Sequence, residues 1–332
     1  MKVVLYGTLI FNLKELFLAK AKTSWQVERL LEGDPKAALA SALADADAMI
    51  SMNWNAGFPP APKLKLIQLA GTGYEGIDFA ALPKAVQVCN CYGHAEGMAE
   101  YTLLGMLVWC HRFHAADRAF RRGSWEYSGR MNGPVNEELF GKALGIVGFG
   151  SIGRAVAERA KAFGMKVIAI NRTRRDPPPC VDDWVGFERL DDTLPGLDYI
   201  VVAAALAPGT QGLIGRAQFA RMRPHAVLIN VGRGPIVDED ALYQALRERR
   251  IRGATIDVWY GAYPTAESPR VPPSRYPFHA LDNLYMTPHT SGWTTGMIER
   301  RWSEIAQNLD RFARGEPLIN VVRRSPLASV LK

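Results

Sequence analysis

Two side chains in the second half of the sequence have the chemistry to act on an anionic substrate. Arg233 stands in "NVGRGPIV", at the end of a strand-like run and between two glycines, where its guanidinium can approach an anion closely. His289 stands in "TPHTSG", after a proline in a loop of small residues, where an imidazole could exchange a proton with a substrate. Taken alone, they also fit a surface arginine and a structural histidine.

A glycine motif earlier in the chain has the pattern of a dinucleotide site. It follows a strand-like run in "LGIVGFGSIGRA" and opens a helix-like one. The first glycine permits a tight turn, the second lets the backbone approach a pyrophosphate, and the third packs the helix against the sheet. A glycine-rich turn without a ligand is the alternative. The predicted cofactor residues of this turn are Gly148, Phe149, Gly150, Ser151, Ile152 and Gly153.

The segment "VIAINRTRRD" places arginines where such a site usually carries a carboxylate for the ribose. Asn171 stands at that place, and a missing carboxylate together with nearby guanidinium groups favours a 2′-phosphate. We therefore predict that NADP(H) is preferred and that NAD(H) is possible. Asp176 counts against this, and a solvated loop is the alternative. The predicted residues are Asn171, Arg172, Thr173, Arg174 and Arg175.

The elements that must position these residues alternate between strand-like and helix-like segments, which predicts an α/β fold with parallel sheets. Four short strands are expected in "KVVLYG", "DAMISM", "LKLIQLA" and "VQVCN", with amphipathic stretches such as "VERLLEGDPKAALASAL" between them. The pattern restarts with "KALGIVGFG", "KVIAINR", "DYIVVAAAL", "AVLINVG" and "GATIDVW". One helical run from Met98 to about Arg122 joins the two series, and a last helix ends at Gly315.

Composition narrows the class of protein. The 332 residues are 48% hydrophobic and 22% charged, as in a globular protein of two domains. The net charge of +7 is spread along the chain, so no nucleic-acid partner is expected. Four cysteines without a C-x-x-C pair predict reduced thiols and no metal site. With no signal peptide and no apolar stretch long enough to cross a bilayer, we expect a cytoplasmic protein without membrane contact.

The order and spacing of these motifs resemble the D-isomer-specific 2-hydroxyacid dehydrogenase family over nearly the whole chain. "NVGRG" and "TPH", at their separation, are the most particular to that family. The resemblance implies two Rossmann- or flavodoxin-like doubly wound parallel-sheet domains with a cleft between them. It implies a substrate domain at 1–97 plus 292–332, a dinucleotide domain at 98–291, and a homodimer formed through the dinucleotide domain.

The resemblance also implies roles for single residues. Arg233 would bind the carboxylate and keto oxygen of a small 2-oxo or 2-hydroxy acid, and His289 would be the acid/base. In the loop "AGTGYEGID", the backbone amides at about Thr72 and Gly73 would hold the substrate carboxylate. Further cofactor positions follow from the same match: Thr102, Val231 and Asp257 around the nicotinamide, and Thr210 near the adenosine.

One position departs from the family. A glutamate is expected five residues past the aspartate of "DV", but "IDVWYGAYP" has Ala262 there, or Tyr263 if one residue is inserted. That glutamate favours the charged imidazole, so without it His289 should be protonated less of the time near neutral pH. Glu267 and Glu96 are the possible substitutes.

The sequence thus predicts an NADPH-dependent reductase of short 2-oxo acids, such as glyoxylate or hydroxypyruvate, or the reverse oxidation. Two alternatives stay open. A formate-dehydrogenase-like or otherwise specialised enzyme would fit "DVW" and "TPHTSG", although the amide side chain of that branch is absent. A dinucleotide-sensing protein comparable to the corepressors of the family would fit the missing glutamate. Retention of both Arg233 and His289 favours the enzyme.

Overall fold

A computed structural model describes residues 1–262, 264 and 268–323 of the chain. The chain divides into two compact units: a first unit of Met1–Gly93 with Thr295–Lys332, and a second unit of His94–Thr294. These boundaries lie close to the predicted ones at 97/98 and 291/292. The assignment of the units to substrate and dinucleotide stays a prediction.

The first unit is built on a six-stranded sheet in the order β13-β5-β4-β3-β1-β2. Strands β1 to β5 are parallel, and their order 2-1-3-4-5 is that of flavodoxin-like folds; β13 pairs antiparallel with β5. The strands are β1 (Lys2–Tyr6), β2 (Gln26–Leu30), β3 (Ala48–Ile50), β4 (Leu66–Gln68), β5 (Gln87–Cys89) and β13 (Val321–Arg323). The helices are α1 (Thr8–Phe11), α2 (Lys14–Lys20), α3 (Lys36–Leu43) and α10 (Thr295–Ala313).

The second unit is built on a seven-stranded parallel sheet in the order β12-β11-β10-β9-β6-β7-β8. Renumbered from β6, this is the order of dinucleotide-binding folds, with its topological switch between β6 and β9. The strands are β6 (Ala143–Val147), β7 (Lys166–Asn171), β8 (Asp183–Gly186), β9 (Tyr199–Val202), β10 (Val227–Asn230), β11 (Gly253–Ile256) and β12 (Leu284–Met286). The helices are α4 (Ala95–Cys110), α5 (Phe113–Arg121), α6 (Ser151–Ala162), α7 (Leu190–Thr193), α8 (Arg216–Arg221) and α9 (Glu239–Arg247).

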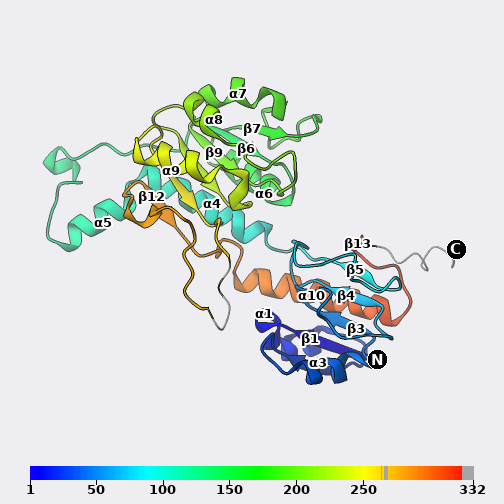
Figure 1. Ribbon diagram of the computed structural model, residues 1–332. Coiled ribbons are helices and arrows are strands. Elements are labelled where there is room, and N and C mark those ends of the chain that lie inside the picture. The colour runs from blue at the N-terminus through cyan, green and yellow to red at the C-terminus, as the bar shows by residue number, and fades with distance from the viewer. Residues whose placement is uncertain (263, 265–267, 324–332) are drawn as a thin grey trace. The chain divides into compact units, whose positions relative to one another are not determined.

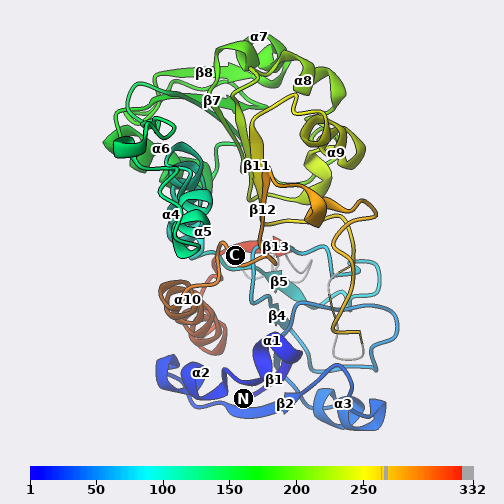
Figure 2. The ribbon, with the colours of Figure 1, turned by 90° about the vertical axis from the view of Figure 1, so that its left-hand side faces the viewer.

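Apolar cores cover both faces of each sheet. In the second unit, helices α4 and α6 bury one face, and α8 and α9 bury the other, as Figure 2 shows. In the first unit, α3 packs on one face and α2 with α10 on the other. A parallel sheet needs cover on both faces because its strands are apolar throughout. The predicted doubly wound α/β class is therefore confirmed for both units.

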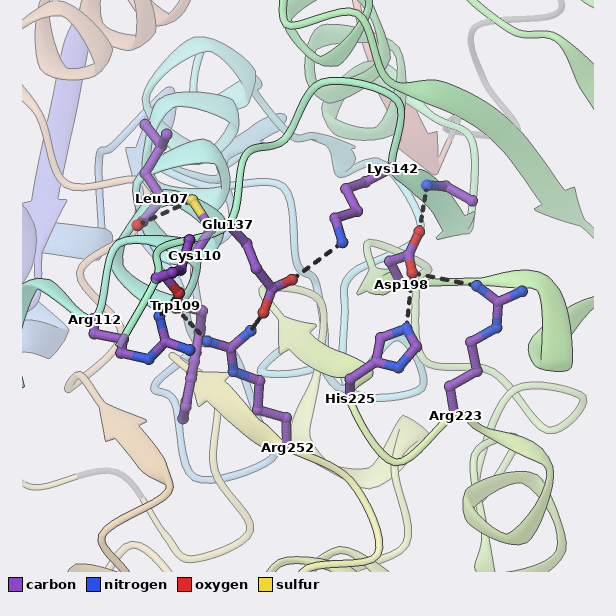
Figure 3. A network of polar contacts seen from close by, with 12 residues as sticks. Leu107, Trp109, Cys110, Arg112, Glu137, Lys142, Asp198, Arg223, His225 and Arg252 are labelled. Atoms are coloured by element: carbon purple, nitrogen blue, oxygen red, sulfur yellow. Dashed lines mark hydrogen bonds and ion pairs between the residues drawn. The ribbon is translucent and has the colours of Figure 1, made fainter. Parts of the chain in front are cut away.

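Polar groups tie together the amino ends of the strands in the second unit (Figure 3). Asp198, just before β9, accepts a 2.8 Å hydrogen bond from the amide of Ala143 and a 2.9 Å contact from His225. Arg252, just before β11, donates to the carbonyl of Trp109 at 2.8 Å and pairs with Glu137. These contacts fix the amino ends of the strands. In open α/β sheets ligands bind at the opposite edge, at the carboxyl ends of the strands.

Two sequence expectations about elements are wrong. The amphipathic stretch 27–43 is not one helix, because Gln26–Leu30 forms strand β2 and α3 begins only at Lys36, after Pro35. The strand lies at the sheet edge and pairs only with β1, so it tolerates charged residues. The long helix from Met98 to Arg122 is interrupted at Arg112, whose φ of 50° is left-handed and ends the regular hydrogen bonding.

The other expected elements are confirmed. All nine predicted strands are present, whereas β2, β8, β12 and β13 were not predicted. Gly315, with a φ of 68°, follows the last helix as expected. Cys89, Cys91, Cys110 and Cys180 are free thiols. The first two pack in the core of the first unit, and burial raises the pKa of Cys89 to about 11 and that of Cys91 to about 12.

Candidate active site

The glycine turn lies at the carboxyl end of β6, beside the topological switch. Gly148 has a φ of 92°, and a Cβ there would lie 2.4 Å from the Cα of Ala204. A Cβ at Gly153 would lie 2.6 Å from the carbonyl oxygen of Gly148. Both positions therefore exclude a side chain, the first because of its conformation and its neighbour, the second because α6 crosses the turn closely.

Gly150 differs from the other two glycines of the motif. It is exposed, and a Cβ there would meet no described atom within 4 Å. It stands directly before the first turn of α6, which no side chain caps. Free backbone N–H groups at a helix N-terminus favour an anion. The turn thus has open space and hydrogen-bond donors where a dinucleotide pyrophosphate would lie.

The arginine segment continues β7 directly into solvent. Asn171 ends the strand, and Arg172, Arg174 and Arg175 are all exposed. None of the described hydrogen bonds or ion pairs uses their three guanidinium groups. The carbonyl of Thr173 accepts a 3.1 Å hydrogen bond from the indole of Trp184 on β8. The backbone of the segment is therefore anchored while its cationic side chains face solvent.

Arg233 follows β10 in a turn that a buried amide holds. The side chain of Asn230, fully buried at the end of β10, donates to the carbonyl of Arg233 at 3.2 Å and accepts from the amide of Gly232 at 3.1 Å. A Cβ at Gly234 would lie 2.3 Å from the carbonyl oxygen of Trp259. Asn230 was not among the predicted site residues, although a polar residue ending an apolar strand is a usable signal.

His289 lies in a loop that Asp257 holds. The Asp257 carboxylate is fully buried; it accepts hydrogen bonds from the Thr287 hydroxyl at 2.6 Å and from the amides of Thr290 at 2.8 Å and Ser291 at 2.9 Å. Its backbone carbonyl accepts from the amide of His289 at 3.0 Å. His289 itself has a φ of 58°, a left-handed conformation that is found at functional sites when the surroundings enforce it.

Two aromatic residues extend this support. The Trp259 indole donates to the carbonyl of Thr287 at 2.9 Å, while the backbone of the same residue lies against Gly234. The hydroxyls of Tyr101 on α4 and Thr287 lie 2.6 Å apart. Trp259 thereby links the Arg233 turn to the His289 loop within the second unit. The sequence reasoning assigned neither aromatic residue.

The surroundings of His289 lower the pKa of its imidazole below the usual value. Part of the ring reaches solvent, but nearby protein keeps water from much of it, and this desolvation is the main cause. The positive charge of Arg233 lowers the pKa further, whereas the negative charge of Asp257 raises it. Arg233 and His289 are therefore close enough to interact electrostatically.

The place of the missing glutamate holds no described carboxylate. Ala262 is exposed, and Tyr263 and Glu267 lie outside the described residues. The Glu96 carboxylate pairs with Arg159 on α6. Among the described residues, Asp257 is the carboxylate that acts on the pKa of His289. Ala262 therefore does not replace the family glutamate. Glu96 does not replace it either, because its carboxylate is paired with Arg159.

The remaining predicted residues hold backbone. The Thr102 hydroxyl donates to the carbonyl of Met98 at 2.7 Å within α4, and the Thr210 hydroxyl donates to the carbonyl of Ala205 at 2.8 Å. Val231 is buried, and its amide donates to the carbonyl of Val202 at 3.1 Å. These contacts fix the local backbone, and a place beside the cofactor stays a prediction for all three residues.

Thr72 and Gly73 lie in the first unit, in the loop that follows β4. The Thr72 hydroxyl donates to the carbonyl of Cys91 at 3.0 Å, and the Thr72 carbonyl accepts from the side chain of Asn90 at 2.8 Å. None of the described hydrogen bonds uses the amide of Gly73. The loop is therefore fixed by its neighbours, which suits backbone amides that bind a carboxylate.

Comparison with known proteins identifies the family. The sequence profile of the D-isomer specific 2-hydroxyacid dehydrogenase NAD binding domain matches residues 103–291. The chain is 31% identical over 323 residues to a glyoxylate reductase of Korarchaeum cryptofilum, covering 94% of each chain. It is 36% identical over 269 residues to a D-3-phosphoglycerate dehydrogenase of Methanocaldococcus jannaschii, with 79% of this chain and only 48% of that protein covered.

A solved structure shares the fold over nearly its whole length. It is a D-isomer specific 2-hydroxyacid dehydrogenase from Xanthobacter autotrophicus Py2, 27% identical, with a TM-score of 0.77 and coverage of 97% of this chain and 98% of that one. The matching NAD binding domain profile and these relatives, together with the two doubly wound units and the glycine turn, define the class as oxidoreductases that use a nicotinamide dinucleotide. More particularly, the chain belongs to the D-isomer-specific 2-hydroxyacid dehydrogenase family.

The described residues also bear on metal binding and on membrane insertion. No group of three or more potential metal ligands is found among them. None of the helices they form is both long and apolar enough to cross a membrane.

Proposed function

We propose that this enzyme reduces short 2-oxo acids to D-2-hydroxy acids with NADPH, and catalyses the reverse oxidation. The observation that carries the proposal is the pairing of Arg233 with His289. Both follow the carboxyl ends of strands in one unit, and the charge of Arg233 acts on the imidazole. An anion anchor beside an acid/base is what reduction of an oxo acid requires.

In the proposed mechanism, Arg233 binds the substrate carboxylate and polarises the oxo group. A role of the backbone amides at Thr72 and Gly73 in holding that carboxylate stays a prediction. A nicotinamide cofactor held by the glycine turn at residues 148–153 would supply the hydride that the carbonyl carbon takes up. Protonated His289 donates its proton to the carbonyl oxygen, so the product is the neutral alcohol and the imidazole is left neutral. Asp257 keeps the imidazole in place through the four hydrogen bonds it accepts from residues 287–291.

The NADPH preference rests on the segment after β7. It has no carboxylate at Asn171 and three exposed arginines without a described partner, which suits a 2′-phosphate. The related Xanthobacter enzyme was solved in complex with NADPH. NAD(H) is proposed as the weaker cofactor. Glyoxylate, in line with the name of the Korarchaeum relative, and hydroxypyruvate are the proposed substrates.

The enzyme is also proposed to form a homodimer through the second unit. Figure 1 shows α5 and the segment after it extending away from the sheet of that unit. We call α5 and residues 124–140 the arm. A groove of about 380 Å³ lies on it, and the lining includes Phe113, Phe120, Trp125 and Tyr127. The first three are more than half exposed. A second copy would cover these aromatic surfaces symmetrically.

A cytoplasmic location stays a prediction.

The experiment that tests the proposal is the initial rate of NADPH oxidation with glyoxylate, hydroxypyruvate, pyruvate and longer 2-oxo acids, with NADH in parallel. We expect turnover of a short acid with NADPH and slower turnover with NADH. Turnover with NADH alone would refute the cofactor preference and leave the chemistry intact. Tight cofactor binding without turnover of any acid would refute the reductase and favour a dinucleotide sensor.

A further inference from the structure

Trp184 joins two separate loops of the second unit, the glycine turn and the arginine segment. It lies on the edge strand β8, opposite Ala169 of β7, and its side chain is buried. The indole Nε1 donates a 3.1 Å hydrogen bond to the carbonyl of Thr173. Thr173 sits in the middle of the arginine segment, so this bond holds the backbone that carries Arg172 and Arg174.

The same indole also touches the glycine turn. The rings of Trp184 and Phe149 have centroids 4.9 Å apart at an interplanar angle of 60°, a favourable tilted contact. Phe149 stands between Gly148 and Gly150, the glycine that faces the open space where a pyrophosphate is expected. One buried side chain therefore connects the arginine segment to the glycine turn.

This connection matters because the arginine segment has little other support. Residues 172–177 are exposed, and three prolines follow at 177–179 before the chain reaches β8. A guanidinium gains bidentate hydrogen bonds only if it is held at the right place, so a loosely held segment would lose affinity for a fixed anion. The ribose and pyrophosphate of a dinucleotide fix the place of its 2′-phosphate relative to the glycine turn.

We propose that Trp184 is a positioning residue for NADP(H): through Thr173 and Phe149 it fixes the arginine segment relative to the glycine turn. This inference rests on the proposed NADPH preference. NAD(H) has no 2′-phosphate, so its binding does not use the guanidinium groups of the arginine segment. Trp184 therefore contributes to the choice between the two cofactors without touching either.

The test compares the binding of 2′,5′-ADP and 5′-ADP by calorimetry, and of NADPH and NADH by fluorescence, in wild type and Trp184→Phe. Phenylalanine keeps a ring against Phe149 and removes the N–H donor. We expect the dissociation constants of NADPH and 2′,5′-ADP to rise about fivefold, the effect of losing one ordinary hydrogen bond. Those of NADH and 5′-ADP should change less than about twofold, because they do not use the arginines.

Trp25→Phe is the matched control. Its indole donates at 2.8 Å to the Thr23 hydroxyl in the first unit, so the control loses one indole hydrogen bond outside the second unit. This control should change none of the four dissociation constants. If Trp184→Phe unfolds, which 5′-ADP binding and the melting temperature report, benzothienylalanine at 184 removes the N–H donor and keeps the size of the ring.

The outcomes separate this inference from the proposed function. Equal weakening of all four ligands would show a general structural role and overturn the inference, as would an unchanged ratio of 2′,5′-ADP to 5′-ADP affinity. In either case wild type would still prefer NADPH. If wild type binds 2′,5′-ADP no more tightly than 5′-ADP, the cofactor preference and the inference both fail.

Discussion

At the scale of single residues, the site combines an unusual backbone with an unusual pKa. His289 adopts a left-handed conformation, and its amide and those of its neighbours are used by Asp257. Its imidazole lacks the family glutamate at Ala262, and desolvation and Arg233 lower its pKa. The loop is thus fixed through its backbone, while protonation of the ring depends on its surroundings.

Replacing His289 by Asn should isolate the role of the imidazole, because Asn also adopts left-handed backbone readily. We expect kcat for oxo-acid reduction to fall by about 10²–10⁴-fold, the usual contribution of a general acid. The dissociation constant of the cofactor and the melting temperature should be unchanged. Steady-state kinetics and cofactor titration check this, and activity within about threefold of wild type would rule out His289 as the acid.

The pH dependence follows from the lowered pKa of His289. Reduction needs the protonated imidazole, so kcat/KM for the oxo acid should decline as pH rises through that pKa, which lies below the usual imidazole value. Oxidation needs the neutral imidazole and should therefore stay active to lower pH than in relatives that have the glutamate. Rate profiles measured in both directions test this.

Ala262→Glu provides the matched variant for the pH profile. A carboxylate at this position should stabilise the imidazolium and move the declining limb for reduction to higher pH. A wild-type limb that already lies well above neutral pH would contradict the lowered pKa.

At the scale of elements, the turn from β6 into α6 separates two roles of glycine. Gly148 and Gly153 have protein atoms less than 3 Å from a Cβ position, so the fold itself requires them. Gly150 has open space and a φ of −97°, which other residues adopt. Its glycine is needed only for a ligand that approaches the backbone.

Gly150→Ala should therefore fold normally and bind cofactor poorly. We expect a melting temperature within about 2 °C of wild type, since no described atom is displaced. The dissociation constants of both NADPH and NADH should rise at least about tenfold, because the new methyl group occupies the space of the pyrophosphate. Gly153→Ala is the comparison and should lower the melting temperature. Unchanged cofactor affinity in Gly150→Ala would contradict the assigned place of the pyrophosphate.

At the scale of the whole molecule, the arm formed by α5 and residues 124–140 should decide the oligomeric state. Sedimentation velocity at micromolar concentration should give a dimer for wild type and a monomer for Trp125→Asp, because a charge in an apolar interface has no partner. Leu18→Asp, at an exposed apolar position of α2 in the first unit, should remain dimeric. A monomeric wild type would contradict the proposed dimer.

Much of this organisation could be predicted from the sequence because it depends on local patterns. Apolar runs such as "LGIVGFG" and "AVLINVG" predict strands, and glycine spacing predicts the turn after β6. The edge strands β2 and β8 were not predicted, because β2 is charged and β8 is short and follows prolines; each pairs with one neighbouring strand. The break at Arg112 was also not predicted, because neither proline nor glycine marks it in the sequence.

The sequence by itself determined the fold class, the family and the two residues with the chemistry to act on an oxo acid, because spacing and residue type carry that information. Only the tertiary structure showed that Asp257 holds the His289 loop, that Asn230 and Trp259 support the Arg233 turn, and that Trp184 joins two loops. Apart from the Asn230 bond, which reaches only three residues ahead, those contacts connect segments at the ends of different strands. The physical reason is that hydrogen bonds and burial between distant segments arise only when the sheet brings the strand ends together.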